Sequence, residues 1–256
     1  MDFLTVIGVV IALGAILGGQ VLEGGHIGSI LQPTAFVIVI GGTIGAICVQ
    51  HPLPVVLKGI SSLSLALFDR KRNGTAEIKQ IIDLAHVVRK QGLLALEGKL
   101  KEITDPFFRK GVQLIVDGTD PKLIHEILET EVEHTEEEGL IAAKVWESAG
   151  GYSPTIGILG AVLGLIHVME NLTDPSKLGS GIAVAFVATV YGVGAANLFF
   201  LPLGNKIKLK HKREASMRRM IVIGLVGVAQ GDNPRILQEK MESCLPQSER
   251  SNSGKR

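Results

Sequence analysis

Long uncharged apolar stretches dominate the pattern of hydrophobic and polar positions along this chain. They contain no Asp, Glu, Lys or Arg, and a helix of about 20 apolar residues is long enough to cross the hydrocarbon core of a bilayer. The pattern therefore predicts four membrane-spanning helices, arranged as two pairs with a charged segment between the pairs. The four stretches are Phe3–Leu22, Gly24–Leu57, Ala149–Met169 and Leu178–Asn205.

The predicted spans divide the chain into membrane and soluble parts. Spans one and two occupy residues 1–57, and spans three and four occupy residues 149–205. Residues 58–148 form a soluble insert between the pairs. Residues 206–256 form a soluble tail, whose polar end we expect to be disordered from about residue 247.

The positions of lysine and arginine predict the orientation of the spans. The turn between spans one and two has neither residue, and the turn between spans three and four has only Lys177. Basic residues instead follow span two, at Lys58 and 70–72, and follow span four throughout 206–219. Positively charged loops stay on the cytoplasmic side of a membrane. We therefore expect a multi-pass membrane protein with the insert, the tail and both termini in the cytoplasm.

The insert and the tail show helical periodicity. Apolar residues of Ile78–Val88 recur at the spacing of one helix face, with Thr75 as a candidate N-cap, and the pattern resumes after Gly92. No alternation typical of β-strands appears, so the predicted fold class is an all-α integral membrane protein with a helical cytoplasmic insert and a helical cytoplasmic tail. Further helices are predicted at Val112–Val116, from Pro121, at Met220–Ala229 (too short to span, and expected to pack on the insert) and from Pro234.

Composition agrees with a membrane protein. The mean hydropathy is +0.34, and the 31 glycines suit membrane helices, where small residues allow close packing. A net charge of +1 gives no indication of a nucleic-acid partner. Cys48 and Cys244 imply no disulfide framework.

The predicted spans lack the side chains that usually carry out catalysis or ion transport. The chain has no phosphate-binding loop, metal-ligand cluster or nucleophile elbow, so we predict neither an enzyme nor a cofactor; His125 and His134 lie among glutamates of a solvated helix face. A transport path normally needs an ionisable group at depth, yet the spans offer only hydroxyls, Asn197 and His167, which falls near the outer end of span three. If the protein moves ions, a partner chain must supply the carboxylate.

Two prolines lie at the cytoplasmic level of spans three and four. Pro154 follows Ser153 at the start of span three, and Pro202 ends span four. Each alone is an ordinary helix-terminal proline. Together they fall on adjacent helices at the same depth, where they would form a ring of rigid hinges in an oligomer.

Several separated motifs resemble the A subunits of bacterial flagellar motor stators, the MotA/PomA family. The resemblance extends over nearly the whole chain, to about residue 245. The motifs that carry it are Gly18–Gly25, Arg89–Glu97, Tyr152–Gly157, Gly164–Ile166, Thr189–Gly192 and Asn197–Leu203.

The resemblance implies an ion channel of the bacterial inner membrane that drives flagellar rotation. Such A subunits form a five-membered ring around two copies of a single-span B subunit of the MotB/PomB type, which carries the ion-binding aspartate. Ion passage turns the ring, and the cytoplasmic insert pushes on a rotor switch protein of the FliG type. The missing carboxylate would then belong to the B subunit.

The resemblance also assigns roles to individual residues. Arg89 and Glu97 would be the principal rotor-facing charges, with Lys90 secondary, and Pro154 and Pro202 would couple ion occupancy to movement. Arg89 and Glu97 share a helix face if Gly92 does not break the helix.

The coupling ion depends on another position of the motif. Sodium-type members of the family have a threonine seven residues after the span-three proline, where this chain has Ala161; the threonine of span four is retained as Thr189. A hydroxyl oxygen suits Na⁺, so the resemblance favours H⁺.

Three other functions are open to a four-span protein with a charged insert. An energiser of the ExbB/TolQ type also forms a ring around a single-span partner, but it has three spans. A structural membrane scaffold without ion flux has the same composition. A membrane enzyme is least favoured, because no catalytic motif is present.

Overall fold

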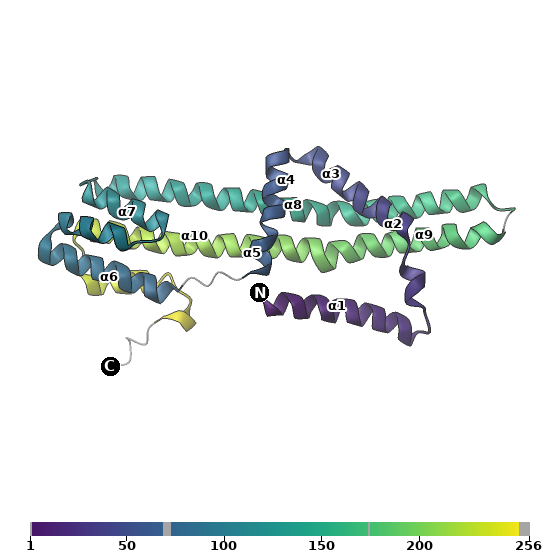
Figure 1. Cartoon of the computed structure of the whole chain (residues 1–256), viewed down its shortest axis with the longest axis horizontal. Helices are drawn as coiled ribbons and strands as arrows, with labels where there is room; N and C mark the ends of the chain where they lie inside the picture. The colour runs from purple at the N-terminus through teal and green to yellow at the C-terminus, as the bar shows by residue number, and fades with distance from the viewer. Residues whose placement is uncertain (1, 69–72, 174, 251–256) are drawn as a thin grey trace. The chain divides into compact units, whose positions relative to one another are not determined.

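The computed structural model describes residues 2–68, 73–173 and 175–250, and nearly all of these residues are helical (Figure 1). No β-strand occurs among them, which agrees with the predicted all-α class. The chain folds as two units, each built from two segments of sequence. The first unit comprises Met1–Arg70 and Gly139–Lys210, and the second comprises Lys71–Glu138 and His211–Arg256.

The first unit contains the four apolar helices predicted to span the membrane. Each has a window of 18 residues that is apolar and long enough to cross a bilayer. The long helices α8 and α10 begin or end in the second unit, so only 139–170 of α8 and 201–210 of α10 belong here. The elements are α1 (Phe3–Leu22), η1 (Ile27–Ile30), α2 (Pro33–Phe36), η2 (Val37–Gly41), α3 (Gly42–Gln50), α4 (Leu53–Ser61), α5 (Leu63–Leu67), α8 (Pro121–Glu170), α9 (Pro175–Gly194), η4 (Ala195–Phe200) and α10 (Leu201–Gln230).

The second span is shorter than the uncharged stretch from which it was predicted. The helix begins at Pro33 and ends at Gln50. His51 adopts an extended conformation (φ −117°, ψ 139°) because the residue before a proline is excluded from the helical region, and Pro52 follows it. The last residues of the stretch, Leu53–Leu57, begin α4, which is too short to span.

Sequence signals explain where the helices of the second unit begin. The Asn73 side chain accepts a hydrogen bond from the backbone N–H of Ala76, so Asn73 caps α6 and the prediction of Thr75 as the cap is wrong. Asp105 caps α7 in the same way, by accepting from Phe108. The elements are α6 (Gly74–Gln91), η3 (Leu93–Glu102), α7 (Pro106–Val116), residues 121–138 of α8, residues 211–230 of α10, α11 (Pro234–Glu242) and η5 (Gln247–Glu249).

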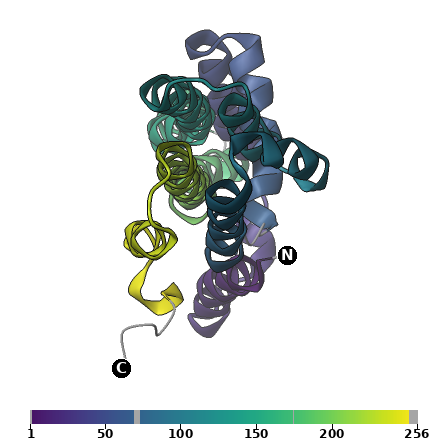
Figure 2. The same ribbon diagram turned by 90° about the vertical axis from the view of Figure 1, so that its left-hand side faces the viewer.

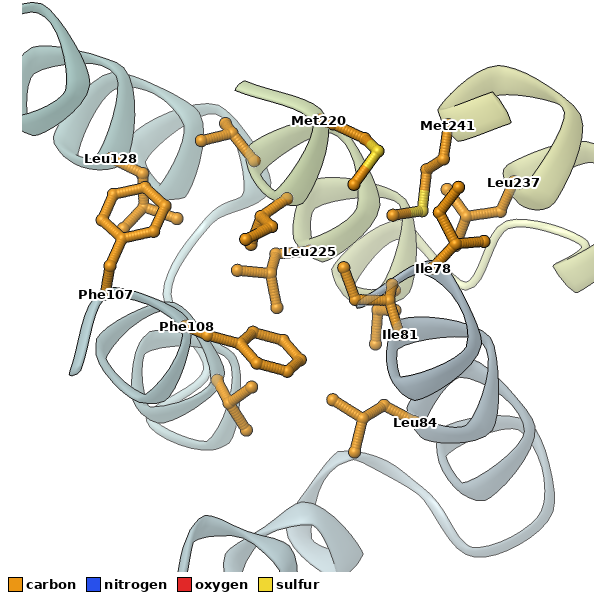
Figure 3. Packing of buried hydrophobic residues seen from close by; sticks show 14 of the residues in the cluster. Ile78, Ile81, Leu84, Phe107, Phe108, Leu128, Met220, Leu225, Leu237 and Met241 are labelled. Carbon is orange, nitrogen blue, oxygen red and sulfur yellow. The ribbon is translucent and has the colours of Figure 1, made fainter. Parts of the chain in front are cut away.

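A single hydrophobic core holds the second unit together (Figure 3). Tail residues supply a large part of it, so the prediction that Met220–Ala229 packs on the insert is confirmed. Figure 2 shows the start of α8 (teal) beside the end of α10 (yellow-green). Labelled core residues are Ile78, Ile81 and Leu84 of α6, Phe107 and Phe108 of α7, Leu128 of α8, Met220 and Leu225 of α10, and Leu237 and Met241 of α11.

Charged contacts join α8 to α10 beside this core. The Arg219 guanidinium donates to Glu129 at 2.7 Å and to Glu136 at 2.8 Å. The hydrogen bond with Glu129 is the main reason why the pKa of Arg219 is raised. The acidic run predicted to continue toward span three therefore lies on one helix and is partly neutralised by the tail.

The end of the tail is ordered further than predicted. Residues Gln247–Glu249 form the short helix η5, where the sequence predicts disorder from about residue 247. The Arg213 side chain binds Glu249 at 2.8 Å, and the Arg250 side chain donates to the carbonyl of Leu245. The predictions for Arg70–Arg72 and for residues 251–256 lie outside the described residues.

Candidate functional site

The close contact between α8 and α9 is the centre of the first unit, and we call it the α8–α9 seam. A Cβ atom added to Gly157 would lie 2.8 Å from the carbonyl oxygen of Ala188 and 3.1 Å from the Cα of Gly192. Added to Gly192, it would lie 2.6 Å from the carbonyl oxygen of Ser153. Only glycine permits two helix backbones to approach this closely, which is the arrangement typical of membrane helix pairs.

A buried hydrogen bond crosses the seam. The Ser153 hydroxyl, which is 0% exposed, donates to the carbonyl of Gly192 at 3.0 Å. An unpaired hydroxyl in an apolar interior is costly, so this bond fixes the register of α8 against α9. The seam is therefore held by backbone contact and one polar link, with no charge.

Pro154 lies inside α8, and the prediction that it begins a helix is wrong. Helix α8 runs without interruption from Pro121 to Glu170 and contains Pro154 in its interior. Proline has no N–H, so the carbonyl of Gly150, four residues earlier, lacks its ordinary helical donor. The weakened turn lies directly beside Gly192 of the seam, because the Cα of Pro154 would be 3.2 Å from a Cβ there.

Pro202 also lies within a continuous helical path, and the prediction that it ends span four is wrong. Helix α9 passes through the π-helical segment η4 into α10, which continues to Gln230. Within this segment the backbone N–H of Leu201 bonds to the carbonyl of Ala196, five residues earlier. The wider π turn accommodates a proline that cannot donate, and π segments in α-helices are frequently found at functional sites.

The two prolines are on adjacent helices but at different levels. Pro202 follows Leu201, whose side chain and backbone N lie against Gly150. Gly150 is about one helical turn before Pro154 on α8. Pro202 therefore lies roughly one helical turn from the level of Pro154, and the two prolines do not share the predicted depth. Pro202 is exposed, while Pro154 is half-buried.

A second π-helical segment, η2, interrupts span two at Val37–Gly41. A polar side chain donates to a carbonyl at each π segment: Thr43, at the start of α3, donates to Val39 of η2 at 2.6 Å, and Asn197 of η4 donates to Val193 at 2.9 Å. Inside a membrane, carbonyls released by helix irregularities are satisfied in this way. Neither segment was predicted, although Asn197 and Pro202 were available as signals.

Ala161 and Thr189 each neighbour a seam residue. A Cβ added to Gly160 would lie 2.8 Å from the Cβ of Ala188, so Ala161 and Thr189 flank this contact from opposite helices. Both are half-buried. The Thr189 hydroxyl donates to the carbonyl of Ala185 at 3.3 Å, which leaves its oxygen lone pairs available.

The predicted rotor-facing charges lie on two different elements. Arg89 and Lys90 occupy the last turn of α6, and Glu97 lies on the 3₁₀ segment η3. Gly92, with φ at +85°, separates them and ends α6, so the condition for a shared α-helical face is not met. All three side chains are exposed, and no hydrogen bond or ion pair links them to another residue in the part of the chain that the structure describes.

Known protein families match the chain from near its start to the tail. The motility protein A N-terminal family matches residues 6–92, and the MotA/TolQ/ExbB proton channel family matches residues 99–220. Motility protein A of Bacillus subtilis is 34% identical over 98% of this chain and 93% of its own length. The chain belongs to the motility protein A family. The predicted membership of the MotA/PomA family is therefore confirmed.

Solved structures of motility protein A complexes share the fold. The structure of C. jejuni MotAB has a TM-score of 0.92 and 32% identity, covering 98% of this chain and all of that one. The flagellar MotAB stator complex from Bacillus subtilis has a TM-score of 0.88 and 32% identity, covering 96% of both chains. Each likeness therefore extends over nearly all of this chain.

Tyr191, within the Thr189–Gly192 motif, makes contacts that the sequence does not predict. Its hydroxyl donates to the carbonyl of Ile30 at 2.7 Å and accepts from the backbone N–H of Gln32 at 3.3 Å. Its ring meets Phe36 edge-on, with centroids 6.4 Å apart. Tyr191 therefore fixes the loop between spans one and two to α9. A tyrosine in an apolar span needs a polar partner, which was the available signal.

An ion pair joins the two ends of the membrane unit's sequence. Lys206 of α10 binds the carboxylate of Asp2 and the hydroxyl of Thr5, so it connects α10 to the start of α1. The hydrogen bond from Lys206 lowers the pKa of Asp2. Residues 2 and 206 were not predicted to meet, because nothing in the periodicity relates span one to span four.

Proposed function

We propose that this chain is the A subunit of a flagellar stator, which forms an ion channel with a single-span B subunit and converts ion flow into torque on the rotor. The observation that carries the proposal is the match to motility protein A over nearly the whole chain, in sequence and in fold. The chain acts as a channel and torque component rather than as an enzyme. The separate match of residues 6–92 to motility protein A favours the motor over an ExbB/TolQ-type energiser.

The chemistry of the spans supports an obligate partner. No carboxylate lies in the four uncharged stretches, and a proton or cation path needs such a group. The solved relatives are MotAB complexes, and we propose that a MotB/PomB-type chain supplies the aspartate here. Helix α1 has no buried residue, so its apolar surface is available to lipid, to the partner or to further copies in a pentameric ring.

The distribution of basic residues supports an orientation in the inner membrane. We propose that both termini and the second unit face the cytoplasm, because the long basic segment after span four stays inside. The exposed charges Arg89, Lys90 and Glu97 would then face a FliG-type rotor switch protein. Exposed charges contribute little affinity, but they steer and orient a contact that exchanges rapidly.

Complementation of a motility-deficient deletion strain tests this function. We expect the wild-type chain, expressed with its B-type partner, to restore swimming and to allow proton entry that acidifies the cytoplasm. Glu97→Lys should abolish or strongly reduce swimming and leave proton entry unchanged, because the charge lies outside the channel. Glu126→Lys, a reversal at another exposed glutamate, is the matched control. The proposal would be contradicted if the wild-type chain restored neither swimming nor proton entry.

We also propose H⁺ as the coupling ion. Thr189 supplies a hydroxyl beside the Gly160–Ala188 contact, whereas Ala161 supplies none. A dehydrated Na⁺ needs several oxygen ligands, while a proton needs only the partner's carboxylate and a water path.

The ion assignment predicts how rotation responds to sodium. Wild-type rotation should persist in sodium-free medium and stop when the proton gradient is removed. Ala161→Thr should introduce dependence on Na⁺. Ala161→Val should not, because valine has nearly the same shape as threonine but lacks the hydroxyl. Swimming speed against Na⁺ concentration measures both. Rotation of the unaltered protein that requires sodium would refute the assignment.

A further inference from the structure

The segment η3 presents an apolar side chain to solvent beside Glu97. After the turn at Gly92, residues Leu93–Glu102 form a 3₁₀ helix, an uncommon length for this conformation. Leu96 is fully buried and holds the segment on the core. Side chains three residues apart eclipse each other in a 3₁₀ helix. Leu94 and Glu97 therefore lie on the same side of η3, and both are exposed.

Leu94 is the most exposed large apolar residue of the second unit among the described residues. Its side chain is 74% exposed, compared with 53% for Ile236 and 46% for Leu123. A single exposed leucine is ordinary on a protein surface, so exposure alone has no consequence. What distinguishes Leu94 is its position in the sequence and on the surface, after the basic end of α6 and on the face of Glu97.

We propose that Leu94 is the apolar anchor of the surface by which this chain contacts its rotor partner; the inference rests on the proposed function. The occupant is a segment of the rotor protein with an apolar side chain for Leu94, an acidic group near Arg89 and a basic group near Glu97. An apolar core with a polar, solvent-accessible rim is the usual anatomy of a protein interface.

The physical need for an anchor follows from the charges themselves. Exposed ion pairs contribute little stability, and at 0.1 M salt the attraction between exposed charges is screened over a distance of about 10 Å. A contact that transmits force must also resist sliding, and burial of an aliphatic side chain stabilises a contact more than an exposed ion pair does. Arg89 and Glu97 would select and orient the partner, and Leu94 would hold it.

The test compares variants of Leu94 in the complete stator complex in cells. Leu94→Ala and Leu94→Gln should shorten the residence time of fluorescently labelled stators at the motor by about tenfold, as expected for lost aliphatic burial, and should lower the torque at stall. Leu94→Met, which keeps the apolar volume, should retain most of both. Leu123→Ala, on α8 of the same unit, is the matched control and should behave as wild type. Proton entry should be unchanged in all four.

The outcomes separate this inference from the function on which it rests. Wild-type residence time and torque in Leu94→Ala and Leu94→Gln, with reduced torque in Glu97→Lys, would overturn the anchor and leave the stator function intact. Equal losses in Leu94→Met and Leu94→Gln would also overturn it, because apolar character would not be what matters. Absence of proton entry with the wild-type chain would instead refute the proposed function, and the anchor with it.

Discussion

Replacing Gly192 with alanine is expected to disrupt the membrane unit and abolish motility. The added methyl group would lie 2.6 Å from the carbonyl oxygen of Ser153 and 3.0 Å from the Cα of Gly157. These neighbours are backbone atoms, so relief requires the two helices to separate rather than a side chain to rotate. Separation would also break the hydrogen bond from Ser153 to Gly192. Overpacking of this kind costs about 1–3 kcal/mol, and losing the buried bond adds about 1–3 kcal/mol.

Gly194, on the same helix, offers a matched control. A methyl group added there meets no atom within 4 Å, so Gly194→Ala should leave the protein unchanged or slightly more stable, since alanine favours helix. The thermal midpoint of the detergent-solubilised protein and swimming in soft agar measure the two variants. Equal midpoints for Gly192→Ala and Gly194→Ala would show that the seam tolerates separation.

The helices and the spans followed from sequence because their signals are local and redundant. A stretch such as Phe3–Leu22 has no charge, and composition alone indicates a span. In the second unit, Ile78, Ile81 and Ala85 of the predicted apolar stripe lie in the core as their period predicts, and Ile82 and Val88 pack against it. The abundance of glycine predicts close packing of the spans, but it does not identify which glycines of α8 and α9 meet. Pairing between helices depends on tertiary contacts that periodicity does not encode.

Irregular backbone was harder to predict. The π segments Val37–Gly41 and Ala195–Phe200 differ from α-helix by a shift of one residue in hydrogen bonding, which leaves the hydrophobic pattern almost unchanged. Likewise, a spacing of three residues, as between Leu93 and Leu96, fits both an α-helix and a 3₁₀ helix. The sequence pattern therefore does not reveal the change from α-helix to 3₁₀ helix at η3. The positive φ of Gly92 marks the point where α6 ends and η3 begins.

For the two prolines, the structural setting predicted from the sequence is wrong. Pro154 and Pro202 are predicted to couple ion occupancy to movement as prolines that begin or end helices. In the structure each lies within a helical path that continues for many residues on both sides. A terminal proline only limits a helix, whereas an interior one creates a weak point where the helix bends. The structure therefore gives a physical basis for movement at these positions that helix ends would not.

Pro154→Ala is accordingly expected to stabilise α8 and to stop rotation. Alanine restores the N–H that donates to the carbonyl of Gly150 and removes a steric conflict, and an interior proline costs a helix about 3 kcal/mol. A stiffer α8 cannot bend beside Gly192, so ion occupancy would no longer be coupled to movement. The thermal midpoint should rise or stay constant while swimming is lost, with normal amounts of protein in the membrane.

Pro33→Ala, at the first turn of α2 where no helical bond is missing, is the control and should leave swimming intact. Full motility in Pro154→Ala would show that bending at this turn is not required, and a lowered midpoint would show that Pro154 stabilises the fold instead.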